Sequence, residues 1–195
     1  MVVPRTREFD TEAAVAAATV VFRDRGYEGA SIQELVDATG VGRGSLYAAF
    51  GSKDGLYLAA LDHYQHQQVD TLIEALQADA PAAQVLRSML LTLVDQIVSD
   101  ERRLSCLMIS AAVERCAHDG QVASKVRHAT DSLQDALTDL ITEGQRRGEL
   151  ADTHDPSDLA RFLDNTMRGL RVMGGVQPDR RALTATVEVA LRCLG

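Results

Sequence analysis

Residues 22–56 read FRDRGYEGASIQELVDATGVGRGSLYAAFGSKDGL, and this stretch decides the fold. It contains two short helical patterns, residues 32–39 and 45–50, separated by a turn that is rich in glycine. Ser31 and the glutamate three residues later form a capping-box pattern at the start of the first one. Helices this short are unstable alone and must pack against neighbours. Two such helices joined by a glycine turn, with another helix behind them, predict a helix-turn-helix.

Helical patterns also flank this stretch on both sides. Residues 11–25 carry an apolar stripe at helical spacing and are followed by Gly26, where a left-handed cap is favoured. A fourth helix is expected at about 53–77. No strand pattern is found, so the sequence predicts an all-α fold of about nine helices. Prolines and glycines divide the remaining chain into five of them, at about 81–100, 104–116, 122–147, 156–172 and 178–194.

Aromatic residues are concentrated in the first third of the chain. Seven of the eight precede residue 65, and only Phe162 follows. This distribution indicates a small N-terminal unit with a core filled by rings, and a larger unit rich in leucine, alanine and valine. We therefore expect a helix-turn-helix domain at 1–52 and a larger helical domain at 53–195.

Composition limits the class of protein. The 195 residues suit one domain or two small ones and contain no apolar run of the ~20 residues that a membrane span needs. The polar N-terminus does not resemble a signal peptide, and three cysteines do not suit a disulfide framework, so we expect a cytoplasmic location. We find no zinc-ligand spacing, phosphate-binding glycine loop or nucleophile elbow, and we expect no metal, no cofactor and no enzymatic activity.

The formal net charge of −8 at first argues against a nucleic-acid partner, because such partners attract basic proteins. The charge is unevenly distributed, however. Residues 1–53 contain six Lys and Arg against seven Asp and Glu, whereas residues 54–195 contain 14 against 21. The helix-turn-helix part is therefore near neutral. Because it neutralises few phosphates, binding to DNA should depend on a fitted site and on dimer geometry.

The helix-turn-helix region resembles the DNA-binding region of the TetR (tetracycline repressor) family over about residues 10–60. The resemblance implies three N-terminal helices, a linking fourth helix, and a larger helical domain that binds a small ligand and dimerises. It is carried by an ordered set of residues at fixed spacing: Phe22, Gly26-Tyr27, Gly40-Val41, Gly44, Leu46-Tyr47, Phe50 and Lys53.

The resemblance also implies contacts with the phosphates of double-stranded operator DNA. Tyr47 and Lys53 match phosphate-contacting positions. Ser31 and Gln33 match a phosphate anchor at a helix N-terminus, which the helix dipole favours. Tyr47 has a simpler interpretation as a core ring. Two arginines of the N-terminal tail are candidates for an arm along the DNA backbone: Arg5 and Arg7.

Base reading is assigned, through the same resemblance, to the second short helix. Arg43 and Ser45 fall at base-reading positions, and arginine reads guanine bidentately; Arg43 has a simpler interpretation as a solvated charge in a turn. The sequence departs from the family pattern at Gly42, which replaces the usual Ser or Thr cap and should cap the helix more weakly. Ala48 and Ala49 stand where His or Tyr is common, so fewer polar groups face the bases.

The C-terminal part offers candidates for a ligand pocket and a dimer surface. Methionines can line adaptable pockets, although filling the core is their simpler role. The last two helices form a four-helix bundle across a two-fold axis in the resembled family, although a domain core could use the same faces. The pocket candidates are Met89, Leu107, Met108, Phe162 and Met167. The dimer candidates are Leu159, Leu163, Met167, Leu170, Val187 and Leu191.

The sequence thus predicts a homodimeric transcriptional regulator, a repressor that a small molecule releases from operator DNA. Two alternatives remain open. In the first, the regulator senses redox conditions through Cys106. In the second, the chain is a helical small-molecule-binding protein that no longer binds DNA, which the few polar residues of the second short helix suggest.

Overall fold

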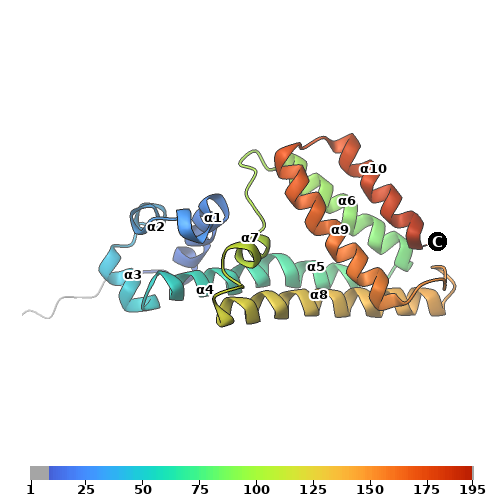
Figure 1. Cartoon of the computed structure of the whole chain (residues 1–195), viewed down its shortest axis with the longest axis horizontal. Coiled ribbons are helices and arrows are strands. Elements are labelled where there is room, and N and C mark those ends of the chain that lie inside the picture. Colours follow the sequence, from blue (N-terminus) through green and yellow to red (C-terminus); the bar gives the residue numbers. More distant parts are fainter. Residues whose placement is uncertain (1–8, 195) are drawn as a thin grey trace, which may run out of the picture.

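The computed structural model describes residues 9–194, which form helices and connecting loops (Figure 1). With α4, η1 and α5 taken as one continuous helix, these residues hold nine helices, which confirms the predicted all-α fold. The elements are α1 (Thr11–Gly29), α2 (Ile32–Thr39), α3 (Arg43–Phe50), α4 (Lys53–Tyr64), the π-helical η1 (Gln65–Asp70), α5 (Thr71–Leu76), α6 (Ala82–Ser99), α7 (Leu107–Glu114), α8 (Gly120–Arg146), α9 (Pro156–Val176), α10 (Arg180–Leu191) and the 3₁₀ turn η2 (Arg192–Leu194).

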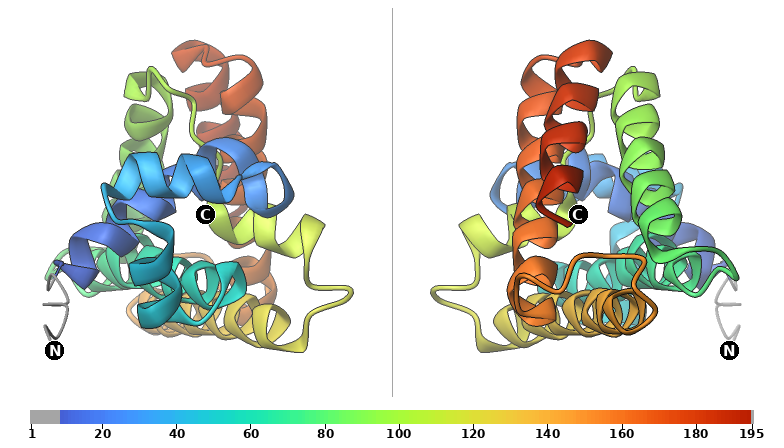
Figure 2. Two further views of the ribbon diagram at one scale, coloured as in Figure 1. Left: turned by 90° about the vertical axis from the view of Figure 1, so that its left-hand side faces the viewer. Right: turned by 90° about the vertical axis from the view of Figure 1, so that its right-hand side faces the viewer.

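The molecule has two ends joined by long helices. α1, α2 and α3 lie at one end, and α6, α9 and α10 stand together at the other (Figures 1 and 2). The continuous α4–η1–α5 helix runs between the two ends, with α8 packed alongside it (Figure 1). Within residues 9–194, no helix is long and apolar enough to cross a membrane.

Local signals set most of the helix ends. Asp10 caps α1 by accepting from the Ala13 amide at 3.0 Å. Asp155 caps α9 ahead of a proline at its first position, as the sequence predicts. α1 breaks at Gly26, whose φ of +71° is costly for any residue with a side chain. The predicted break at Gly26 is therefore present, but a further helical turn follows it and α1 ends at Gly29.

α9 does not end at its glycine pair as predicted but continues to Val176. The reason is packing: Gly174 is buried, and a Cβ there would overlap the side chain of Ile97 on α6. This glycine lets two helices approach closely and does not end the helix.

The fourth helix has the predicted extent but contains an unpredicted π-helical turn at Gln65–Asp70. Such turns are rare and are often found at functional sites. This one lies midway between the two ends of the molecule (Figure 1).

Buried residues form two clusters. The C-terminal cluster joins α5, α6, α8, α9 and α10. The N-terminal cluster is built around Phe22, Leu35 and Leu61, all with no exposed surface, and also includes Leu107 and Met108 from α7. Each such side chain contributes about 1.5–3 kcal/mol on burial. α7 and the first turns of α8 therefore pack with the helix-turn-helix part, although they follow it in the chain. The domain boundary between residues 52 and 53 stays a prediction.

Gly55 provides a test of this packing. A Cβ at Gly55 would overlap the backbone carbonyl oxygen of Phe50, whereas a Cβ at Gly44, within α3, would meet no atom within 4 Å. We expect Gly55→Ala to lower the free energy of unfolding by roughly 1–3 kcal/mol. Gly44→Ala should raise it by up to about 1 kcal/mol, because alanine is the better helix former. Urea unfolding followed by circular dichroism measures both, and an equal effect of the two changes would contradict the packing described here.

Candidate DNA-binding site

The start of α2 is closed by its own side chains. The Ser31 hydroxyl accepts from the Glu34 amide at 3.1 Å, and the Glu34 carboxylate accepts from the Ser31 amide at 2.9 Å and from its hydroxyl at 2.8 Å. These bonds to Ser31 lower the pKa of Glu34, with the backbone amide as the larger cause. The predicted capping box is thus confirmed. Gln33 is likewise occupied, since its amide donates to Asp37 at 2.8 Å.

α3 presents a mostly solvent-exposed outer face. Leu46 is its buried anchor, while Arg43, Ala48 and Ala49 are exposed and Ser45 is half-buried. Gly42 occupies the N-cap and supplies no side-chain hydrogen bond, as the sequence predicts. The first turn is held by the backbone alone, through bonds from the amides of residues 45 and 46 to the Gly42 carbonyl.

The basic side chains of this end lie over tyrosine rings. The Arg43 guanidinium carbon is 5.2 Å from the centre of the Tyr47 ring, and the Lys53 ammonium is 4.4 Å from the centre of the Tyr27 ring. Such cation–π contacts hold a charge in place without neutralising it. Tyr47 is half-buried, so it is not a fully enclosed core ring. Arg43 and Tyr47 are therefore brought together, and Lys53 is positioned at the start of α4.

A network of contacts that the sequence did not predict holds Tyr27 and Asp54, which lie beside Lys53. The guanidinium of Arg115, at the end of α7, lies 3.8 Å from the Tyr27 ring centre and bonds Asp54 at 2.9 Å and Asp119 at 2.6 Å. The Tyr27 hydroxyl also donates to Asp54 at 2.7 Å. Arg115 is far from the others in the chain, so no local pattern points to these contacts.

The adjacent residue, Glu114, binds the backbone where α1 breaks. Its carboxylate accepts from the Tyr27 amide at 2.7 Å and from the Glu28 amide at 3.4 Å. These amides have no helical partner after the break at Gly26, so the carboxylate satisfies them. The last turn of α7 therefore fixes both the end of α1 and the start of α4.

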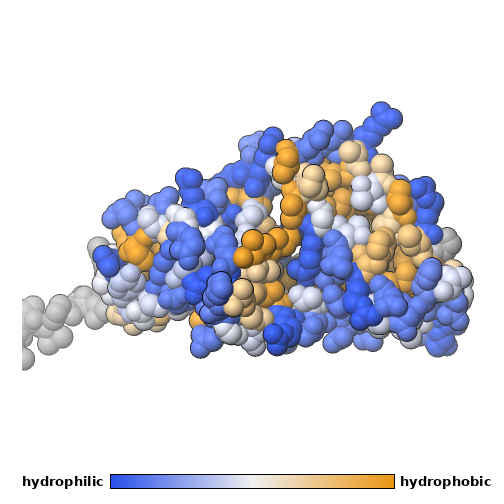
Figure 3. Space-filling view, viewed as in Figure 1, coloured by the Kyte–Doolittle hydropathy of each residue, from blue (hydrophilic) through white to orange (hydrophobic). Residues whose placement is uncertain are grey.

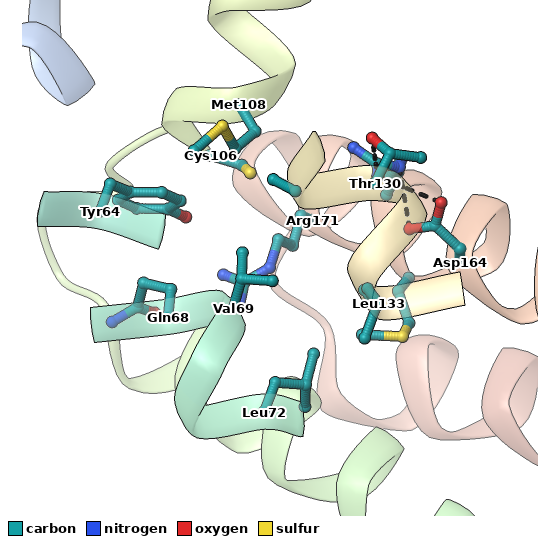
Figure 4. A pocket seen from close by; sticks show the side chains of 13 residues that line it. Tyr64, Gln68, Val69, Leu72, Cys106, Met108, Thr130, Leu133, Asp164 and Arg171 are labelled. Atoms are coloured by element: carbon teal, nitrogen blue, oxygen red, sulfur yellow. Dashed lines mark hydrogen bonds and ion pairs between the residues drawn. The ribbon is translucent and has the colours of Figure 1, made fainter. Parts of the chain in front are cut away.

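A cavity lies between this end and the C-terminal helices. Its apolar chamber has a volume of about 60 Å³ and adjoins a polar chamber of about 270 Å³. Residues 68, 106 and 171 line both. Figure 4 shows the apolar chamber between the helices that carry Tyr64, Met108 and Leu133. Its lining is Tyr64, Gln68, Val69, Leu72, Cys106, Met108, Ala129, Thr130, Leu133, Asp164, Met167, Arg168 and Arg171.

The pocket prediction is only partly met by this cavity. Met108 and Met167 line the apolar chamber, and Met89 lines neighbouring surface hollows. Leu107 is fully buried in the N-terminal cluster and lines neither chamber. Phe162 lines neither chamber, and its ring is 41% exposed on α9, so its role in a pocket stays a prediction.

The predicted dimer residues are already covered within a single chain, so their role in a dimer stays a prediction. Leu159, Leu163, Met167, Leu170 and Val187 are each at most 5% exposed in a single chain, and Leu191 packs against the same cluster. Side chains that are already buried in one subunit have little surface to offer a partner. The apolar stripes of α9 and α10 face the subunit's own core.

The outer face of α9 and α10 is instead the unpartnered one. Figure 3 shows apolar side chains gathered over these helices. A surface groove of about 410 Å³ runs between the two helices. The exposed apolar residues are Phe162, Val172, Met173, Val176 and Val189.

A short helix pair with an exposed, cation-bearing second helix, backed by two longer helices, defines a helix-turn-helix DNA-binding protein. Comparison with known proteins identifies the family. Residues 14–60 match the model of the bacterial regulatory proteins, tetR family, and residues 82–190 match that of the tetracyclin repressor-like C-terminal domain. The chain belongs to the TetR family, a family of transcriptional regulators and not of enzymes.

Individual relatives agree with this assignment. The chain is 31% identical to the uncharacterized HTH-type transcriptional regulator YezE of Bacillus subtilis, over 97% of this chain and 98% of that one. It is 29% identical to the HTH-type transcriptional repressor ComR of Escherichia coli, over 86% and 80%. The solved structure of a CifR cysteine mutant complexed with 26bp operator DNA is 33% identical, covers 98% of this chain and 100% of that one, and has a TM-score of 0.87.

The Arg115 network yields a prediction about pKa values. The pKa of Asp54 is lowered first by the Tyr27 hydroxyl and then by Arg115, and that of Asp119 first by the Val122 amide and then by Arg115. Because folding lowers these pKa values, the stabilisation is present above the unfolded-state pKa of about 3.9 and is lost as the pH falls through the folded value. We expect Arg115→Gln to raise both pKa values.

Carboxyl NMR titration of the wild-type and variant chains measures this shift. The difference in stability between the two proteins should also shrink as the pH falls from about 4 through the lowered pKa values of the two aspartates. Arg146→Gln, at the far end of α8, is the matched control and should leave both pKa values unchanged. An unchanged pKa of Asp119 in the Arg115 variant would show that the network is not formed in solution.

Proposed function

We propose that this chain is a homodimeric repressor that binds operator DNA through α3 and is released from it by a small molecule. The observation that carries this proposal is the exposed face of α3 together with Lys53, where two cations lie over tyrosine rings and are left available to an anionic partner. We assign it no catalytic activity and place it in the cytoplasm, where the operator DNA of a bacterial regulator lies.

Phosphate contacts are proposed for Tyr47, in the second turn of α3, and for Lys53, at the start of α4. Their positions suit contact with the backbone on one side of a groove that α3 enters. Ser31 and Gln33 are proposed to anchor a further phosphate at the N-terminus of α2, where the amides and the dipole favour an anion. The capping carboxylate of Glu34 would have to move aside for a direct contact. Arg5 and Arg7 lie outside the described residues.

Base reading is proposed for Arg43 and Ser45. The Arg43 side chain is exposed and carries five N–H donors in a planar fork that matches the O6 and N7 acceptors of guanine. Ser45 lies half-buried on the same helix, two residues on. The exposed Ala48 and Ala49 offer apolar contact, which suits a thymine methyl group.

Dimerisation is proposed through the outer face of α9 and α10. Pairing this face across a two-fold axis would cover the exposed Met173 and Val176, which are 61% and 70% exposed. A symmetric dimer presents two copies of α3 to half-sites about 34 Å apart. Because each subunit neutralises few phosphates, both must engage for tight binding.

Release by a ligand is proposed to act through α4 and α7. The apolar chamber touches Tyr64 at the end of α4, and both chambers touch Cys106 at the start of α7. A molecule that binds this cavity more tightly in the DNA-free arrangement shifts the population toward it. Sensing through Cys106 stays a prediction, and the alternative of a protein without DNA binding is not favoured by the family match over residues 14–60.

The proposed DNA contacts separate into two experimental classes. Lys53→Ala and Tyr47→Phe should weaken binding to operator and to unrelated DNA by similar factors, because phosphates are present in every sequence. For Lys53→Ala the slope of log K against log salt should fall by about one, because one phosphate is no longer neutralised. Arg43→Ala should weaken operator binding by about 1–3 kcal/mol and relax the base preference at one position per half-site.

Fluorescence anisotropy with an operator obtained by binding-site selection measures both effects. Arg146→Ala, which removes a cation at the far end of α8, serves as the charge-matched control. If Arg43→Ala changed neither affinity nor base preference, base reading would have to be reassigned to another residue.

The dimer surface is tested by adding one charge to it. Met173→Glu places a carboxylate on the proposed interface, so we expect a monomer in sedimentation analysis and an operator affinity reduced by about 100-fold or more. Val113→Glu is the matched control, because Val113 is 82% exposed on α7, away from this face. If the Met173→Glu variant remained dimeric, the dimer interface would have to lie on another face of the subunit.

A further inference from the structure

We propose that the cavity binds a small organic anion, a carboxylate with an apolar body, and that Arg171 receives the carboxylate. This inference rests on the proposed function, in which a small molecule releases the DNA, and it names the chemistry of that molecule. The inference is based on the charges that line the polar chamber and on which arginines of the described residues form ion pairs with aspartates.

The polar chamber carries an excess of positive charge. Its charged lining residues are Arg23, Arg103 and Arg171 against one carboxylate, Asp100. Arg23 lies 3.9 Å from Asp100 and also donates to the Ser105 carbonyl at 3.0 Å. The excess is notable because residues 54–195 as a whole are acidic. Cations are therefore disfavoured in this chamber and anions are attracted.

Arg171 differs from comparable arginines in having no carboxylate partner. Within residues 9–194, four arginines are half-buried, at positions 23, 115, 168 and 171. The first three pair with an aspartate, as in the 2.9 Å contact of Arg168 with Asp164. Arg171 makes one hydrogen bond, to the Gln96 side-chain oxygen at 3.4 Å, which is long for this kind of bond. A half-buried guanidinium without a counter-charge is unfavourable until an anion binds it.

Arg171 lies at the junction of the two chambers. Its side chain comes from α9 and lines both of them. Figure 4 shows this side chain reaching between the side that carries Cys106 and the side that carries Leu133. A carboxylate bound there by the planar guanidinium would extend its apolar body into the apolar chamber, past Val69 and Leu72.

The size of the apolar chamber links binding to α4. The chamber is small, about 60 Å³, so an alkyl or aryl body that enters it lies directly against the side chains that line it. Tyr64 and Val69, on α4 and η1, are among them. At the other end, an anion in the polar chamber competes with Asp100 for Arg23 of α1. One occupant therefore acts on both helices that support α2 and α3.

Isothermal titration calorimetry on the full chain tests the proposal with paired probes. Octanoate is compared with octanol, and phenylpropanoate with phenylpropanol, so that each pair shares its carbon skeleton and differs in charge. We expect each carboxylate to bind at least about tenfold more tightly than its alcohol. Arg171→Gln should remove this preference and leave alcohol binding within about twofold.

Arg161→Gln is the matched control, since Arg161 lies on the same helix but is exposed and paired with Asp158. It should keep the preference for carboxylates. If Arg171→Gln fails to fold, Arg103→Gln gives a second reading: this exposed arginine of the polar chamber should lower carboxylate affinity by about threefold without altering the fold. Equal binding of acid and alcohol, retention of the preference in Arg171→Gln, or no binding by either carboxylate at millimolar concentration would overturn the proposal.

Operator binding, measured separately by anisotropy, keeps the two proposals apart. A carboxylate that binds through Arg171 without releasing operator would leave this inference standing and contradict the ligand-responsive part of the proposed function. Operator binding by a chain that shows no preference for carboxylates would contradict this inference and leave the proposed DNA binding standing.

Discussion

The contact between the last turn of α7 and the break in α1 is the interaction on which the arrangement of the DNA-binding helices depends. The Glu114 carboxylate satisfies two backbone amides that the break leaves without helical partners. The close approach requires glycine at position 26, because a Cβ there would overlap this carboxylate. Arg115 then binds the ring of Tyr27 and the carboxylate of Asp54. Since α2 and α3 are too short to be stable alone, their orientation follows from α1 and α4, which these two residues hold.

The same short helix reaches the cavity at its other end. Cys106 is the N-cap of α7 and lines both chambers, while Glu114 and Arg115 end the helix about 12 Å away. A helix of two turns is rigid over this length, so a movement at its start is carried to its end. α7 therefore connects the cavity to the helix-turn-helix by packing contacts, beside the connection along α4 and η1.

Features fixed by neighbouring residues were predictable from the sequence. The capping box of α2, the uncapped start of α3 and the Asp155–Pro156 start of α9 each depend on a few adjacent side chains. Features fixed by partners distant in the chain were not. An apolar stripe on α9 shows that one face is buried, but does not tell whether the subunit or its dimer partner buries it; the subunit does so here. The π turn at 65–70 has no local signature and lies where the helix passes the cavity.

The distribution of charge explains why whole-chain charge was a poor guide to function. Acidic residues hold the buried or half-buried cations of the core network, as Asp54 and Asp119 hold Arg115 and Asp164 holds Arg168. Cations that lack such partners are the informative ones, because their charge is left for a molecule outside the chain. Arg43 and Lys53 lie over aromatic rings at the DNA-facing end, and Arg171 lies at the junction of the two chambers. A protein with a net charge of −8 can therefore still offer positive charge to the two anions that we propose, a nucleic acid at one end and a small carboxylate at the cavity.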